Sequence, residues 1–118
     1  MKPKLREATE HNALTAKYLR GIADPTRLTI LQLLADNGEM NVGQLIEALG
    51  SIPQARVSDH LACLKWCHFV STRREGRFVY YRIEDPQVLN VIQLVTALAE
   101  KNAEQLAACD RIEEVDGD

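Results

Sequence analysis

Residues 54–83 read QARVSDHLACLKWCHFVSTRREGRFVYYRI, and this stretch decides the fold. In its first part Val57, Leu61 and Leu64 recur at intervals of four and three residues, which is the repeat of one face of an α-helix. The spacing predicts a single helix over residues 54–67. These three side chains should face the core, and the polar residues between them should face outward.

The second part of the stretch has the composition of a β-hairpin. Residues 69–74 and 77–83 are rich in β-branched, aromatic and arginine side chains. They flank Glu75-Gly76, a pair that favours a two-residue hairpin turn. The sequence therefore predicts a helix followed directly by a basic, aromatic hairpin.

Two shorter helices are predicted before this stretch, each with a start signal. Asp24 precedes Pro25, so its carboxylate can accept hydrogen bonds from the free amides of a first helical turn, where proline needs no donor. Asn41 stands in the same capping position before a second apolar-periodic segment. The predicted helices run over residues 25–35 and 42–49.

Helices are also predicted at both ends of the chain. The first ends near residues 21–24, and Asp85-Pro86 repeats the start signal and opens a long last helix. The apolar arc of the last helix is wider than one small domain needs, so we expect it to pair with a second copy of the chain. The apolar positions are Leu14, Tyr18, Leu19 and Ile22 in the first helix and Val88, Leu89, Val91, Ile92, Val95 and Leu98 in the last.

These elements define a fold class that is mostly α-helical with a small β-hairpin (α+β). Two short helices joined by a glycine-containing turn and followed by an arginine-rich hairpin form a winged helix-turn-helix, whose second short helix reads the major groove of DNA. The 118 residues suffice for one such domain and leave no room for another. We expect the domain to span residues 1–112 and an acidic disordered tail to span residues 113–118.

The net charge of −3 hides a strong asymmetry along the chain. Residues 53–82 hold six basic and two acidic side chains, whereas residues 83–118 hold two basic and nine acidic ones. The basic segment suits a polyphosphate such as double-stranded DNA, although an ordinary solvated surface could carry the same charges. The longest uncharged stretch, residues 86–99, is too short to cross a bilayer, and no apolar targeting segment opens the chain. We therefore expect a cytoplasmic protein with no membrane partner.

Candidate DNA-binding residues follow from side-chain type and position. The leading turns of the predicted recognition helix carry donors and acceptors for base edges, and the hairpin carries arginines for phosphates. For His60 a role in helix packing is an equal alternative. The candidates are Gln54, Arg56, Ser58, Asp59 and His60 for bases, Lys65 on the same helix, and Arg73, Arg74 and Arg77 for phosphates.

Three motifs in order carry a family resemblance over nearly the whole chain. Residues 24–27 (DPTR), 54–61 (QARVSDHL) and 74–81 (REGRFVYY) resemble the ArsR/SmtB family of bacterial repressors. The resemblance implies a homodimeric winged-helix repressor that pairs through its first and last helices and leaves operator DNA when a metal ion or other inducer binds. The sequence departs from the family at His68, where a glycine is usual. Histidine tolerates a left-handed helix end better than a branched residue does.

The three cysteines are candidate metal ligands. Cys63 and Cys67 lie four residues apart on the predicted recognition helix, so both thiolates can reach one ion, and Cys109 near the C-terminus could be a third ligand. Thiolates select soft ions, so Hg(II), Cd(II) or Pb(II) is the expected inducer and As(III) or Zn(II) less so. The alternatives are a packing role for Cys63 and Cys67 and an incidental Cys109.

The cysteine pattern also resembles that of the cadmium and lead sensor of the family. In that protein the third ligand comes from the tail of the other subunit, which implies a site shared between subunits. Two other metal sites of the family look absent. Residues 41–43 (NVG) stand where arsenic and cadmium sensors carry Cys-x-Cys, and residues 88–100 lack the Asp/His pairs of the zinc sensors.

Two other functions compete with metal sensing. A winged-helix repressor could instead be switched by thiol oxidation or by an organic inducer. A thiol enzyme using Cys67 with His68 is disfavoured, because neighbouring residues on a helix point in different directions and no anion-binding loop accompanies them. We therefore expect no enzymatic activity and no organic cofactor.

Overall fold

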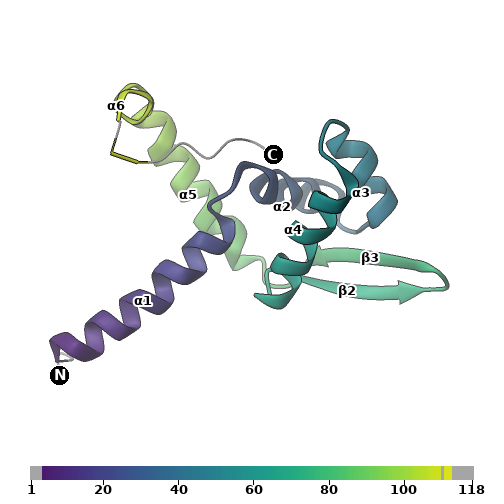
Figure 1. The fold of residues 1–118 in the computed structure, drawn as a ribbon, viewed down its shortest axis with the longest axis horizontal. Coiled ribbons are helices and arrows are strands. Elements are labelled where there is room, and N and C mark those ends of the chain that lie inside the picture. Colours follow the sequence, from purple (N-terminus) through teal and green to yellow (C-terminus); the bar gives the residue numbers. More distant parts are fainter. Residues whose placement is uncertain (1–3, 110, 113–118) are drawn as a thin grey trace.

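The computed structural model describes residues 4–109 and 111–112, so the predicted acidic tail lies outside the described residues. Its helices are α1 (Leu5–Ile22), α2 (Pro25–Asn37), α3 (Val42–Leu49), α4 (Gln54–Trp66), α5 (Gln87–Lys101) and α6 (Ala103–Ala108). Its strands are β1 (Met40–Asn41), β2 (Val70–Glu75) and β3 (Phe78–Ile83). The mostly helical fold with a small hairpin is confirmed (Figure 1).

Two of the three predicted start signals, Asp24 and Asn41, act as helix caps, whereas α5 begins at Gln87 after Pro86, a cap residue that forms no side-chain hydrogen bond. The Asp24 carboxylate accepts a hydrogen bond from the Arg27 amide at 3.0 Å, with Pro25 in the first turn of α2. Asn41 and Gln44 form a reciprocal capping box, in which each side chain accepts from the other residue's amide at 2.9 Å. Both caps satisfy amides that would otherwise lack a partner, and they fix where α2 and α3 begin.

The hairpin forms with its turn one residue later than predicted. Glu75 pairs with Phe78 in the ladder, so the two loop residues are Gly76 and Arg77. Gly76 has φ +60°, and glycine at the first loop position is what a type II′ turn requires. The sequence predicts Glu75-Gly76 as the two loop residues, because a glycine favours a turn without fixing which of the two loop positions it takes.

A third strand, which the sequence analysis did not predict, completes the sheet. The order is β1-β3-β2, and β1 pairs antiparallel with β3, with Met40 opposite Tyr81 and Asn41 opposite Tyr80. A strand of two residues carries no detectable alternation. It joins the hairpin to the start of α3, so the sheet connects the wing to the helix-turn-helix.

Helix α4 ends in the left-handed turn expected for His68. The backbone there has φ +62°, and the Phe69 amide donates to the Leu64 carbonyl at 2.9 Å across that turn. The helix stops at Trp66, one residue before the predicted end, and Cys67 is its C-terminal cap. Histidine thus closes the helix in a conformation that costs a non-glycine residue energy.

The core lies among α2, α3, α4 and the sheet. Val57, Leu61 and Leu64 of α4 are buried as predicted. They pack in one cluster with Ile22, Ile30, Leu31, Leu34, Met40, Leu45, Leu49, Phe69, Val70, Val88 and Ile92.

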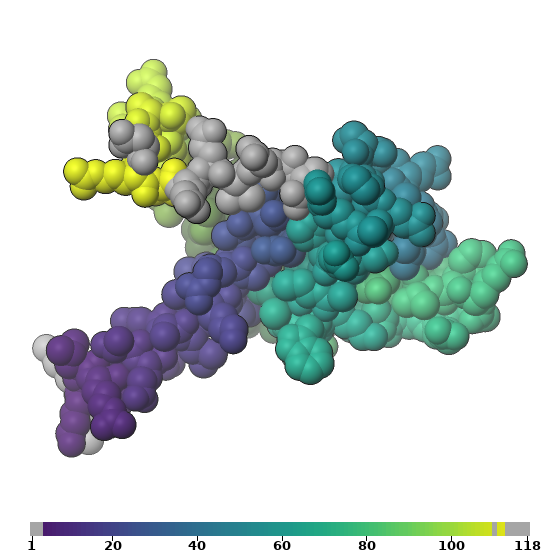
Figure 2. Space-filling view, in the orientation of Figure 1, coloured from purple at the N-terminus to yellow at the C-terminus, as the bar shows by residue number. Residues whose placement is uncertain are grey.

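Helix α1 projects from this body, and so does the hairpin (Figures 1 and 2). Of the α1 residues that the structure describes, only Ile22 at the end of the helix is buried. The predicted single last helix divides into α5 and α6 at Asn102. Within the described residues, no helix has the length and apolar character to span a bilayer.

Candidate nucleic-acid interface and cysteine site

The leading turns of α4 present their polar side chains to solvent. Gln54, Arg56, Ser58 and Asp59 are exposed, whereas Val57 between them is fully buried. The helix is therefore anchored by one face, and its opposite, polar face points to solvent. Lys65, near the other end of the same helix, is also exposed.

His60 lies apart from these candidates because it is only 8% exposed. Its Nδ1 is 3.2 Å from an Nη1 of Arg27, and its Nε2 is 3.9 Å from the Asp24 carboxylate. Since a guanidinium can only donate, Nδ1 accepts and the ring proton belongs on Nε2, toward Asp24. The helix-packing alternative describes this position, and we omit His60 from the set proposed to contact bases.

Arg27 is a residue whose role sequence reasoning missed. Its Nε donates to the Gly21 carbonyl at 2.7 Å and its Nη2 to the Arg20 carbonyl at 3.2 Å, at the end of α1. Together with His60, one side chain thus joins α1, α2 and α4. The sequence singled out Arg27 only as part of the DPTR motif. Its contact with His60 could not be predicted because 33 residues separate the two.

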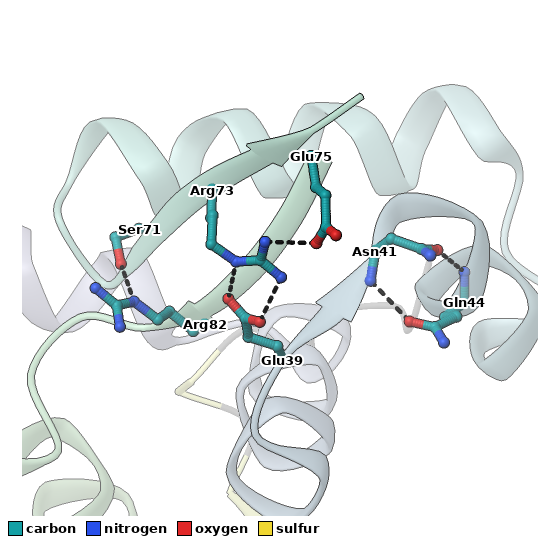
Figure 3. A network of polar contacts seen from close by, with 7 residues as sticks. All are labelled: Glu39, Asn41, Gln44, Ser71, Arg73, Glu75 and Arg82. Atoms are coloured by element: carbon teal, nitrogen blue, oxygen red, sulfur yellow. Dashed lines mark hydrogen bonds and ion pairs between the residues drawn. The ribbon is translucent and has the colours of Figure 1, made fainter. Parts of the chain in front are cut away.

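The hairpin arginines have different environments. Arg74 and Arg77 are exposed near the tip, and the guanidinium of Arg77 lies 5.5 Å from the Phe78 ring centre. Arg73 instead forms ion pairs with Glu39 and Glu75 (Figure 3). Arg74 and Arg77 thus fit the predicted phosphate role more closely than Arg73 does.

The cysteine pair lies at the C-terminal end of α4. Cys63 is half-buried and Cys67 exposed, and both are free thiols whose side chains are close enough to hydrogen-bond. Partial desolvation of its sulfur and the neighbouring Cys63 thiol raise the pKa of Cys67, against the opposing effect of the nearby Lys17 and Arg27 cations. The cysteine pair therefore lies at the end of α4 and near cations of α1 and α2.

Cys109 is half-buried at the end of α6. Figure 1 shows α6 at the outer end of α5, whereas Cys67 ends α4 beside the hairpin. Among residues 4–109 and 111–112 no group of three or more His, Cys, Asp or Glu side chains could hold a metal ion. One copy of the chain therefore brings together two of the three predicted ligands.

Two thiols one helical turn apart fit a soft metal ion as a partial donor set. Soft, thiophilic cations accept few sulfur ligands, whereas Mg(II) and Mn(II) require several oxygen donors. The donors present in one copy thus suit the predicted class of ion and leave room for a further ligand.

An arginine-bearing wing beside a helix with one anchored and one polar face defines a winged helix-turn-helix DNA-binding protein. A sequence profile described as bacterial regulatory protein, arsR family, matches residues 24–72. The chain belongs to the ArsR family of DNA-binding transcriptional regulators, a family without enzymatic activity.

Two relatives bear on the type of regulator. The chain is 43% identical over 102 residues to the probable mercury resistance operon repressor of Streptomyces lividans, covering 86% of this chain and 80% of that one. It is 36% identical to the transcriptional regulator CmtR of Mycobacterium tuberculosis, covering 81% and 80%. The mercury repressor is the more similar of these two relatives, and CmtR is more distant.

Solved structures agree with the fold. The homodimeric winged helix-turn-helix domain Mb0332 of Mycobacterium bovis superposes with a TM-score of 0.68 at 33% identity, over 87% of this chain and 93% of that one. The M. tuberculosis protein Rv0081 superposes with a TM-score of 0.72 at 24% identity, over 82% and 96%, and supports the fold alone.

Proposed function

We propose that this regulator is a repressor that binds operator DNA as a homodimer and releases it when a soft heavy-metal ion binds its cysteines. The observation that carries the proposal is the placement of Cys63 and Cys67 at the C-terminal end of α4, the helix whose leading turns present Gln54 and Arg56 to solvent. Mercury(II) is the first candidate because a relative is named for mercury resistance. Cadmium(II) and lead(II) share the thiolate preference.

DNA binding is supported by the exposed polar side chains of α4 and the exposed arginines of the wing. Gln54, Arg56, Ser58 and Asp59 can reach base edges when α4 enters a major groove of about 12 Å. Arg74 and Arg77 can then contact phosphates beside the groove. The protein would act in the cytoplasm, where bacterial DNA lies.

Homodimer formation is supported by exposed apolar surface on α1 and α5. Leu14 is 68% exposed, Leu94 67% and Leu98 58%, and such side chains rarely remain in water on an isolated domain. An almost wholly apolar groove of about 320 Å³ lies between the same helices, lined by Leu19, Ile22, Ala23, Leu28, Ile92, Val95 and Thr96. A second copy would cover both and place two recognition helices for two half-sites.

In the proposed metal site Cys63 and Cys67 of one copy provide two thiolates, and Cys109 of the other copy provides the third. A bound ion would supply metal–sulfur bonds that link the two copies through α4. Each thiol must release its proton to serve as a ligand. Because Cys109 is not beside the pair within one copy, the site is complete only in the dimer.

The residues around the pair explain how the site could affect DNA binding. Lys17 of α1 and Arg27 of α2 are the cations near Cys67, and Arg27 also holds His60 of α4. Thiolate formation would draw both cations toward the pair and so change how α4 is held against α1 and α2. A coupling of about 1–3 kcal/mol, usual for allosteric proteins, would weaken operator binding about 5- to 150-fold.

The test is fluorescence anisotropy with labelled DNA from the promoter of the protein's own gene, with and without Hg(II), Cd(II) or Pb(II). We expect tight binding by the metal-free protein and release by one of these ions. Cys63→Ser and Cys67→Ser should retain DNA binding and lose the release, whereas Ala62→Ser on the same helix should behave as wild type. If all the cysteine variants still release DNA, or if peroxide alone releases it, the metal mechanism is wrong.

A further inference from the structure

The guanidinium of Arg73 lies on an exposed side chain, yet protein groups occupy its donors. Its Nε and Nη2 donate to the two carboxylate oxygens of Glu39 at 3.1 and 2.9 Å, and its Nη1 donates to Glu75 at 2.6 Å (Figure 3). The same group lies 4.7 Å from the ring centre of Tyr80. A paired, two-point contact of this kind fixes orientation as well as distance.

These contacts cross the whole sheet. Arg73 of β2 stands opposite Tyr80 of β3, and Tyr80 stands opposite Asn41 of β1. Glu39 lies just before β1, so the side chain of Arg73 passes over the middle strand to reach it. Since Asn41 caps α3, the contact ties the hairpin to the start of the helix-turn-helix.

Carboxylates already neutralise the Arg73 guanidinium. Glu39 and Glu75 both form ion pairs with it, and Arg82 is a further cation near Glu39. The hydrogen bond from Arg73 lowers the pKa of Glu39, and the hydrogen bonds to both carboxylates raise the pKa of Arg73, so the Arg73–Glu39 pair stays charged at neutral pH. All three hairpin arginines, Arg73, Arg74 and Arg77, are exposed, but at Arg73 a phosphate would have to displace Glu39 from a bidentate pair.

We propose that Arg73 is a positioning residue that holds the wing against the start of α3 through Glu39, and that Arg74 and Arg77 provide the phosphate contacts of the hairpin. The proposal rests on the DNA-binding function proposed above. It replaces the role predicted for Arg73 from sequence. It also assigns a function to Glu39, an acidic residue beside a DNA-binding surface.

The salt dependence of DNA binding distinguishes the two roles. Log affinity falls as log salt rises, and each lost phosphate contact makes this slope less steep by about one. We expect this change for Arg74→Gln and for Arg77→Gln, measured by anisotropy with the labelled promoter duplex. Arg73→Gln should weaken binding about three- to tenfold at an unchanged slope, because the wing is misplaced without loss of a contact.

Glu39→Gln provides the opposing predictions. If Arg73 positions the wing, this variant weakens binding as Arg73→Gln does, and the double variant is no weaker than either single one. If Arg73 contacts phosphate, Glu39→Gln frees it and tightens binding, and Arg73→Gln flattens the salt slope; either result overturns the proposal. Arg73→Lys should behave like Arg73→Gln because lysine keeps the charge and loses the two-point contact.

Arg82→Gln is the matched control for loss of charge. Arg82 lies on β3 and donates to Ser71 at 3.2 Å instead of pairing with Glu39 (Figure 3). We expect this variant to bind DNA within about twofold of wild type. Circular dichroism and thermal unfolding confirm that each variant is folded.

An NMR measurement of the Arg73 side chain itself tests the proposal separately from the proposed function. The Nε–H signal of Arg73 in ¹⁵N-resolved NMR should exchange slowly with water, should lose that protection in Glu39→Gln, and should be unchanged when promoter DNA is added. If wild type binds no DNA, the proposed function fails while this signal still tests the pairing. Fast exchange of Arg73 in wild type, or a shift of its signal on DNA binding, would overturn the positioning role.

Discussion

The Nη1 atom of Arg27 lies 3.2 Å from Nδ1 of His60, and this contact joins α2 to α4. Arg27 also holds two carbonyls at the end of α1, and His60 lies one turn before Cys63 on α4. The buried Asp24 carboxylate is 3.9 Å from the other ring nitrogen. Three helices thus meet at one polar contact beside the cysteine pair, and this contact sets how α4 is held.

Loss of His60 should therefore destabilise the protein without removing a DNA contact. His60→Ala removes the contact that Arg27 and the buried Asp24 carboxylate make with the ring, so we expect the free energy of unfolding in urea to fall by about 1–3 kcal/mol. The bonds of Arg27 to the Gly21 and Arg20 carbonyls remain. Ser58→Ala, on the exposed face of the same helix, should change it by less than about 0.5 kcal/mol. If His60→Ala were as stable as Ser58→Ala, the contact would have no structural importance.

The left-handed backbone at His68, after α4, predicts a substitution that stabilises the protein. His68→Gly should raise the free energy of unfolding by up to about 1 kcal/mol, because glycine adopts φ near +62° without a steric cost. The ion pair of His68 with Glu84 at 3.1 Å is exposed and should contribute little. Glu84→Gln measures that contribution separately, and a stability loss in His68→Gly larger than in Glu84→Gln would refute the strain.

Alkylation of Cys67 should depend on pH in a direction set by its neighbours. Its raised pKa keeps it a thiol at neutral pH, so its reaction with iodoacetamide should increase with pH and reach half its maximum above the ordinary range for cysteine. Cys63→Ser removes one cause of the rise and should move the midpoint to lower pH. Lys17→Gln removes a cation and should move it to higher pH; shifts of opposite sign would contradict this arrangement.

Metal affinity should also rise with pH. Each thiol that binds must lose a proton, so with three thiols in the proposed site the logarithm of apparent affinity should rise by up to about three per pH unit below their pKa values. Titration by ultraviolet thiolate–metal absorption checks this. A pH-independent affinity would exclude the cysteines as ligands.

Dimer formation should depend on the exposed face of α5. Leu98→Asp places a charge in the proposed interface, so we expect sedimentation equilibrium to show monomers where wild type is a dimer. Asn90→Asp adds the same charge to an exposed polar position of the same helix and should leave the dimer intact. A monomeric wild type, or a dimeric Leu98→Asp, would contradict the proposed interface.

Local signals in the sequence predicted most of the fold. Asp24 and Asn41 mark helix starts because their caps involve residues within three positions, and the apolar repeat of α4 reports its buried face directly. Strand β1 was missed because two residues show no periodicity. The hairpin turn was displaced by one residue because its register depends on pairing between strands.

The candidate site was less predictable for the same reason. His60 and Arg73 have partners 33 and 34 residues away, so residue type alone could not separate a DNA contact from an internal one. Cys63 and Cys67 were predictable as neighbours because one helical turn joins them. The position of Cys109 relative to that pair depends on how two copies associate, which spacing within one chain does not encode.

The central claim is that metal binding and DNA binding oppose each other through α4. Thermodynamic linkage requires the effect to be reciprocal, so promoter DNA must weaken metal binding by the factor by which metal weakens DNA binding. The decisive measurement is the affinity of the wild-type protein for Cd(II), by thiolate absorption, with and without saturating promoter DNA. We predict an affinity about 5- to 150-fold lower when DNA is bound. An affinity for Cd(II) that is the same in both conditions would contradict the account.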